Sequence, residues 1–144
     1  MKCIIQSRQN ERGQSMVELA LTITFLMLLL AGTMDLGRAF FTWLAMRDAA
    51  QEGASYGSIN SGDVPGVQDR VWDNLEQVIR DPTSHVGVSV SVSGHCLGDT
   101  VQVLVTYPFT ITTPLLGSVI GDSIPIRATV NDTVLMPLCP SAYP

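Results

Sequence analysis

The chain has 144 residues, of which 46% are hydrophobic and 15% are charged, and its formal net charge is -5 at pH 7. This length allows one ordinary domain at most. Apolar residues are concentrated near one end of the chain, so the globular part, here called the head, must be small. The eight basic residues are scattered rather than gathered into a stripe that could follow a phosphate backbone. We therefore expect no nucleic-acid partner.

An uncharged apolar run extends from Leu19 to Met34. It approaches the roughly 20 residues that cross the hydrocarbon core of a bilayer, which predicts a single-pass membrane helix at about 16–36. Basic residues precede the run, so the N-terminus should stay in the cytoplasm and the rest of the chain should lie outside. A cleaved secretory signal fits less well, because the run is long and no Ala-x-Ala site follows Leu30; an uncleaved signal anchor remains an alternative.

The helical pattern continues past the apolar run, because residues 35–53 lack proline and repeat apolar residues at intervals of three and four. This predicts one helix over residues 14–57, about 60 Å long. Its distal half should pack an apolar face on the head, made of Leu36, Ala39, Phe40, Trp43, Met46 and Ala50. Its solvent-facing side should carry the charged residues Asp35, Arg38, Arg47, Asp48 and Glu52. Small residues near its end should let another element come close: Ala49, Ala50, Gly53, Ala54 and Gly57.

Residues 58–144 should form the outer domain. A second amphipathic helix is predicted at about 66–80, ended by the sequence Asp81-Pro82 because the residue before proline is pushed out of the α region. The apolar period then changes to two, which predicts half-buried strands. These strands are expected at about 86–93, 100–107 and 123–134. The fold class is therefore α+β, with a small antiparallel sheet covered by the distal half of the long helix.

The segment RGQSMVELALTITFLMLLLAGTMDLGRAFFTWLAMRDAAQEGASYGS, followed by a helix and three strands, resembles the TadE-like proteins of tight-adherence pilus systems. The likeness is densest from Arg12 to Gly57. Its specific elements are Gly13, Glu18, DLGRAF at residues 35–40 and AAQEGASYG at residues 49–57. The resemblance implies a type IV pilin-like fold and a role as a pseudopilin or minor pilin. It also implies a place in the bacterial cytoplasmic membrane, or in the pilus itself, with an extracytoplasmic outer domain.

The same resemblance implies processing of the N-terminus. A prepilin peptidase would remove a basic leader at residues 1–13 by cutting between Gly13 and Gln14, which makes Glu18 the fifth residue of the mature chain. Further implied partners are other pilin-like subunits, the pilus assembly machinery and membrane lipid. The chain departs from the major pilins, which typically carry tyrosine after this glutamate, because Leu19 stands here and a sizeable outer domain follows.

Glu18 lies at the N-terminal start of the apolar run, so its carboxylate should have a partner. A charge at the centre of a membrane helix costs about 2.5–3.5 kcal/mol on insertion scales, and less near an interface. After cleavage, the new α-amino group of Gln14 would lie one helical turn away, on the same subunit or on a neighbour. Pairing there would offset the desolvation of Glu18 and set the register between packed helices. In the alternative interpretation, Glu18 simply lies among the lipid headgroups.

The three cysteines fall on two sides of the predicted membrane. Cys3 lies in the leader, on the reducing side, whereas Cys96 and Cys139 both lie outside, where disulfides persist. We therefore expect a disulfide between Cys96 and Cys139. Closing a loop of that length contributes roughly 4 kcal/mol in the chain-entropy model.

Two other kinds of function remain as alternatives to a structural pilus component. One is a signal-anchored extracytoplasmic binding module, which would lack cleavage after Gly13. The other is a small enzyme, because His95 next to Cys96, with His85 and Asp99 nearby, could form a thiol–histidine nucleophile or a zinc cluster. These residues have no recognisable catalytic or metal-ligand spacing. We expect no enzyme activity, no cofactor and no metal, and a free Cys96 thiol would revive the enzyme alternative.

Overall fold

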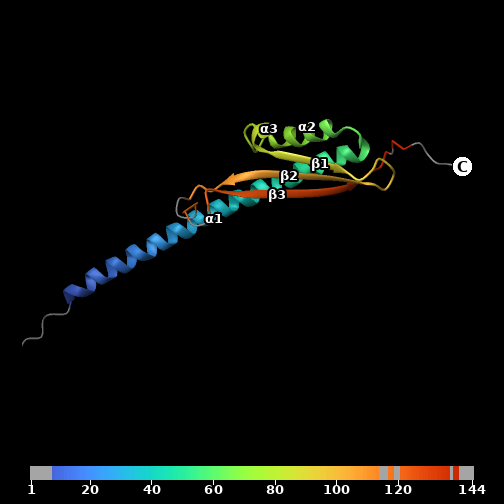
Figure 1. Ribbon diagram of the computed structural model, residues 1–144. Coiled ribbons are helices and arrows are strands. Elements are labelled where there is room, and N and C mark those ends of the chain that lie inside the picture. The colour runs from blue at the N-terminus through green and yellow to red at the C-terminus, as the bar shows by residue number, and fades with distance from the viewer. Residues whose placement is uncertain (1–7, 114–116, 119–120, 137, 140–144) are drawn as a thin grey trace, which may run out of the picture.

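A computed structural model describes residues 8–113, 117–118, 121–136 and 138–139, with side chains from residue 13 onward. One long helix runs out of a small head made of shorter helices and a sheet (Figure 1). The elements in chain order are α1 (Arg8–Ile59), α2 (Val64–Leu75), α3 (Pro82–His85), β1 (Gly87–Val92), β2 (Thr100–Thr110) and β3 (Ser123–Thr133). The predicted α+β fold, with a long N-terminal helix packed on a small antiparallel sheet, is confirmed.

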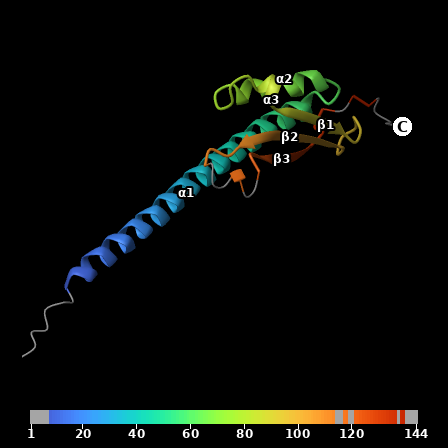
Figure 2. The same cartoon turned by 60° about the vertical axis from the view of Figure 1, so that its left-hand side comes forward.

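Helix α1 joins the apolar run to the head without interruption, and its N-terminal half stands clear of every other element (Figure 2). It is longer than the predicted helix at residues 14–57, since it begins at Arg8 and ends at Ile59. The arginines, glutamine and glutamate among residues 8–12 are good helix formers, which explains the earlier start. The helix therefore passes through Gly13 instead of beginning after it.

The three strands form an antiparallel sheet in the order β1-β2-β3. Val103 at its centre pairs with Val90 on one side and with Val130 on the other. Strand β2 extends to Thr110, beyond the predicted end at residue 107, and continues through Pro108. Because β1 pairs only as far as Thr106, Pro108 lies where β2 is an edge on that side, so the missing N–H of proline interrupts no ladder there.

Helices α1 and α2 pack on one face of the sheet and against each other, and the core lies between these layers. Val101, Val103 and Val105 of β2 are fully buried on that face. The small residues of α1 permit the close approach that their size predicts. A Cβ atom built on Gly57 would lie 2.9 Å from Cγ1 of Val101, so the backbone of α1 comes directly against the sheet.

Helix α2 occupies Val64–Leu75 and is shorter than the predicted helix at 66–80. It begins at Asp63, whose side chain caps the helix by accepting a hydrogen bond from the Gly66 amide at 3.1 Å. After Leu75 the chain makes a turn, closed by a hydrogen bond of 2.8 Å from the Ile79 amide to the Leu75 carbonyl. This turn buries Ile79, which is why the apolar pattern continued beyond the helix.

Candidate assembly and membrane-anchoring site

The N-terminal half of α1 exposes its whole circumference. Every residue from Gly13 to Leu30 is exposed, and many of them are large and apolar. From Gly13 onward the helix is long and apolar enough to cross a membrane, and none of its most apolar window is buried against the head. The helix is therefore compatible with a single-pass membrane anchor.

Three threonines in or near this half have their hydroxyl groups satisfied within the helix. Thr22, Thr24 and Thr33 each donate a hydrogen bond of 2.8 Å to the carbonyl oxygen four residues earlier. An unsatisfied polar group in hydrocarbon costs several kcal/mol, so these internal bonds make the hydroxyl groups compatible with an apolar surrounding.

The residues expected to take part in processing and assembly lie at the free end of α1. Gly13, Gln14 and Glu18 are all exposed, and a Cβ atom built on Gly13 would meet no atom within 4 Å. Among the side chains that the structure describes, none gives the Glu18 carboxylate a hydrogen bond or an ion pair. The described residues of the head leave this end of the helix open and supply no partner for Glu18.

Asp35 fastens α1 to the end of strand β2. Its carboxylate accepts hydrogen bonds from the backbone amides of Thr113 at 2.9 Å and Thr112 at 3.4 Å. Arg38, one turn later, reaches the Asp35 carboxylate at 3.5 Å, donates to the Thr112 hydroxyl and lies over the ring of Phe109. The DLGRAF motif therefore ties the chain after β2 to the helix at the end of the apolar run.

This contact corrects the prediction that Asp35 lies on the solvent-facing side of α1. Asp35 is only 7% exposed, whereas Leu36 and Phe40, expected to face the head, are 71% and 61% exposed. Fully buried Met46 and Ala50 do face the head as predicted. The buried stripe reaches position 35 when followed back from Met46 in steps of three and four. A hydrophobicity pattern instead predicts that the apolar neighbour Leu36 is buried. The hydrogen bonds that Asp35 accepts come in part from backbone amides, which no sequence pattern displays.

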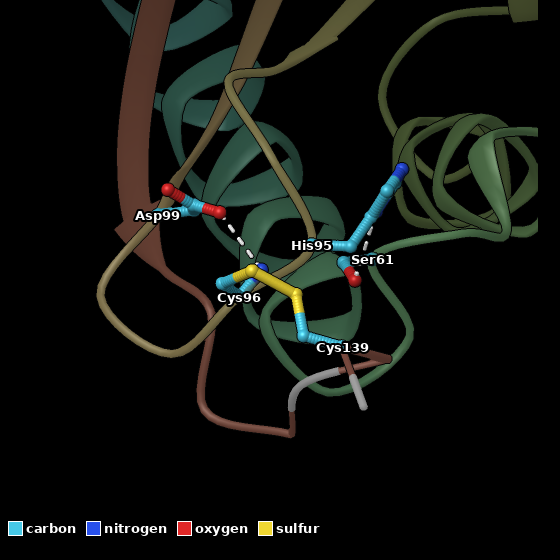
Figure 3. The surroundings of a disulfide bond; sticks show 5 residues. All are labelled: Ser61, His95, Cys96, Asp99 and Cys139. Atoms are coloured by element: carbon cyan, nitrogen blue, oxygen red, sulfur yellow. Dashed lines mark hydrogen bonds between the residues drawn. A yellow bond between two sulfur atoms is a disulfide. The ribbon is translucent and has the colours of Figure 1, made fainter. Parts of the chain in front are cut away.

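Cys96 and Cys139 are joined in the structure, as expected from the sequence. The Cys96–Cys139 disulfide has a Cα–Cα distance of 5.3 Å and links the β1–β2 loop to the C-terminal tail (Figure 3). Asp99 accepts a hydrogen bond of 2.7 Å from the Cys96 amide, and His95 lies 3.2 Å from the Ser61 hydroxyl. These contacts hold the loop in place and leave Cys96 without a free thiol.

The tail is also bound to the head by backbone hydrogen bonds. Leu138 donates to the carbonyl of His95 at 2.9 Å, and Leu135 donates to the carbonyl of Ser58 at 2.8 Å. The tail thus connects the hairpin loop to the last turn of α1. Over the described part of the chain, no three His, Cys, Asp or Glu side chains are grouped so that they could hold a metal ion.

A small α+β head on a helix with an exposed, membrane-length apolar half is compatible with a single-pass, helix-anchored class of protein. Within this chain, residues 13–55 match the family model described as TadE-like protein, which confirms the resemblance seen in the sequence. The matched segment starts at Gly13 and includes Glu18, Asp35 and Arg38. Searches of the curated proteins and of the solved structures found no significant match. The family match implies a part in tight-adherence pilus assembly.

Proposed function

We propose that the protein is a membrane-anchored structural component, a pseudopilin or minor pilin, of a tight-adherence type pilus assembly or secretion system. Its N-terminal helix anchors it in the bacterial cytoplasmic membrane and packs against other pilin-like subunits, while the head lies outside. The observation that carries this proposal is the fully exposed apolar half of α1, which lies within the segment that matches the TadE-like family. A helix of this kind has no cover of its own and needs lipid or other helices around it.

The exposed apolar surface of α1 is longer than a membrane anchor needs. Beyond the apolar run, Leu36, Phe40 and Leu44 form a stripe on the outside of the helix and are 71%, 61% and 41% exposed. They extend that surface about 12 to 15 Å past Asp35, at 1.5 Å per residue. This stripe supports a role in helix–helix assembly, because it remains apolar where the bilayer no longer covers it.

In this proposal the prepilin peptidase removes residues 1–13, and Glu18 of the mature chain pairs with the α-amino group of Gln14 during assembly. The exposure of Gly13 and Glu18 supports access to both residues. Because α1 is helical through Gly13, the peptidase must locally unwind the helix to reach the bond after it.

N-terminal sequencing and intact mass of the membrane-extracted protein test this proposal. We expect a mature chain that begins at Gln14, and we expect Gly13→Leu to insert into the membrane but keep its leader. Gly37→Leu is the matched control, because Gly37 lies in the same helix and is also free of neighbours within 4 Å. It should be cut normally. A mature N-terminus at Met1 would favour the signal-anchored binding module, and one beyond Leu30 would indicate a secretory signal.

A further inference from the structure

A groove of about 740 Å³ lies where α1 leaves the head, between α1, the turn after α2 and strand β2. Its wall on α1 is one helical stripe that includes Leu30, Met34, Gly37 and Phe41. Gly37 leaves this wall hollow, because a Cβ atom built on it would meet no atom within 4 Å. In Figure 1 the α3 end of the head points toward the free half of α1. The groove thus lies on the membrane side of the head.

The opposite wall is also apolar. It includes Val78 from the turn after α2 and Phe109 from β2. Val78 is 40% exposed, whereas Phe109 is 5% exposed and is packed firmly into the head. An occupant of this groove would therefore touch apolar side chains on both sides.

The groove spans the level at which a bilayer changes from hydrocarbon to headgroups. Met34 ends the uncharged run, and Arg38 lies four residues further, about 6 Å along the helix axis. A bilayer of 40–45 Å with a hydrocarbon core of about 30 Å has a headgroup layer of roughly 5–7 Å on each side. Arg38 is thus at the height of the lipid phosphates when Met34 is at the edge of the hydrocarbon.

Arg38 lies beside the groove and retains free donors, while the Asp35 carboxylate at 3.5 Å balances part of its positive charge. Its contacts with Asp35 and Thr112 both use Nη1, and in the described part of the chain Nη2 and Nε have no polar partner. The side chain is 55% exposed. A guanidinium group binds phosphate through two parallel N–H donors, which suits the free side of Arg38.

We propose that this groove binds one anionic glycerophospholipid, with an acyl chain along the α1 stripe and its phosphate at Arg38. The proposal rests on the proposed membrane anchoring of α1. A neighbouring copy in the same register would bring its own Arg38 to this level rather than an anion. Its exposed carboxylate, Glu18, would lie about 30 Å lower along the axis. A lipid therefore fits the combination of apolar walls and a cation better than a second helix does. The bound lipid would fix the height of the head above the membrane.

The test uses the full-length protein purified in a non-ionic detergent and native mass spectrometry. The probes are phosphatidylglycerol and zwitterionic phosphatidylcholine with the same acyl chains. We expect retention of one phosphatidylglycerol in preference to phosphatidylcholine, by at most the roughly fivefold that one unpaired basic residue near a membrane surface supplies, because Asp35 lies 3.5 Å from Arg38. Arg38→Gln should abolish the preference, whereas its matched control Arg47→Gln should keep it, because Arg47 lies over Trp43 outside the groove. Gly37→Leu should reduce the retention of both lipids by filling the groove.

Three results would overturn the proposal. The first is equal retention of both lipids, and the second is a preference that survives Arg38→Gln. The third is the absence of any retained lipid. Copies carrying Met34→Cys or Val78→Cys that then crosslink to each other would show that a second copy occupies the groove instead. Failure of the proposed membrane anchoring gives a different result from failure of the lipid site. In that case the wild-type protein would be released from membranes without detergent. A protein that stays in the membrane fraction but has no lipid preference refutes the lipid site alone.

Discussion

The contact between α1 and α2 at Gly53 can be tested by adding a single methyl group. In Gly53→Ala, the new Cβ would lie 2.6 Å from Cγ2 of Val71 and 3.3 Å from the carbonyl oxygen of Val67. Val71 is fully buried and its β-branched side chain has few alternative rotamers, so it has little freedom to move away. The two helices must therefore separate slightly or distort.

The expected magnitude follows from a comparison with Gly37→Ala in the same helix. Both substitutions gain helix propensity, roughly 0.8–1.0 kcal/mol per residue, but a methyl group on Gly37 meets no atom within 4 Å. The propensity gains cancel in the difference between the two variants. What remains is the overpacking at Gly53, about 1–3 kcal/mol. We expect Gly53→Ala to be less stable than Gly37→Ala by that amount.

Urea unfolding of the full-length protein in mild detergent measures this difference. Tryptophan fluorescence, from Trp43 on α1 and Trp72 on α2, is a suitable probe, because both rings are partly buried and the indole N–H of Trp72 donates to the Val86 carbonyl at 3.4 Å. The Gly53→Ala variant should unfold at a lower urea concentration than Gly37→Ala, with a similar slope. Equal midpoints for the two variants would refute the close packing of α1 on α2 at this position.

Three further predictions concern the free helix end, the disulfide and an acidic turn. Glu18→Gln should insert into the membrane and be cleaved normally but lose crosslinking to other pilin-like subunits. Moving the carboxylate to position 17 should not restore the crosslinking. Normal crosslinking and normal piliation of Glu18→Gln would show that Glu18 only lies at the membrane interface. Reducing the Cys96–Cys139 disulfide should lower the free energy of unfolding by up to about 4 kcal/mol in denaturant titrations, whereas an unchanged midpoint would contradict this loop-closure effect. The hydroxyl groups of Ser84 and Thr83 donate hydrogen bonds to Asp81 and hold the pKa of its carboxyl below the ordinary value. The stabilisation from these bonds is therefore complete above the unfolded-state pKa and is lost as the pH falls through the lower folded-state pKa. Asp81→Asn should therefore flatten the acid side of the stability–pH curve, and an unaltered curve would exclude this contribution.

The fold was predictable from the sequence where a pattern repeats. The alternation from Val101 to Val105 predicts which side of β2 is buried, and the apolar run predicts the free half of α1. The end of α2 was less predictable, because Ile79 continues the apolar period although it belongs to a turn. Periodicity reports which side chains are buried, not which hydrogen bonds the backbone makes.

The candidate site likewise has features that the sequence predicts and features that it does not. The sequence identified Glu18 by its place at the mouth of the apolar run, and it paired Cys96 with Cys139 from the predicted topology. It did not predict that Asp35 is buried, because the donors that surround it include backbone amides from a segment more than seventy residues away. Such a contact depends on where strand β2 ends over the helix, which is a property of the folded chain.

The attachments at Asp35 and at Ser58 determine how the protein responds to a pulling force. The first attachment holds the end of β2, the second holds the tail, and the two lie about 35 Å apart along α1. A load applied along the helix axis therefore acts in shear on both attachments and on the packed layer between them. It cannot peel the head away one contact at a time. Because α1 is one continuous helix from Arg8 to Ile59, traction on its membrane half reaches the head without passing through a hinge.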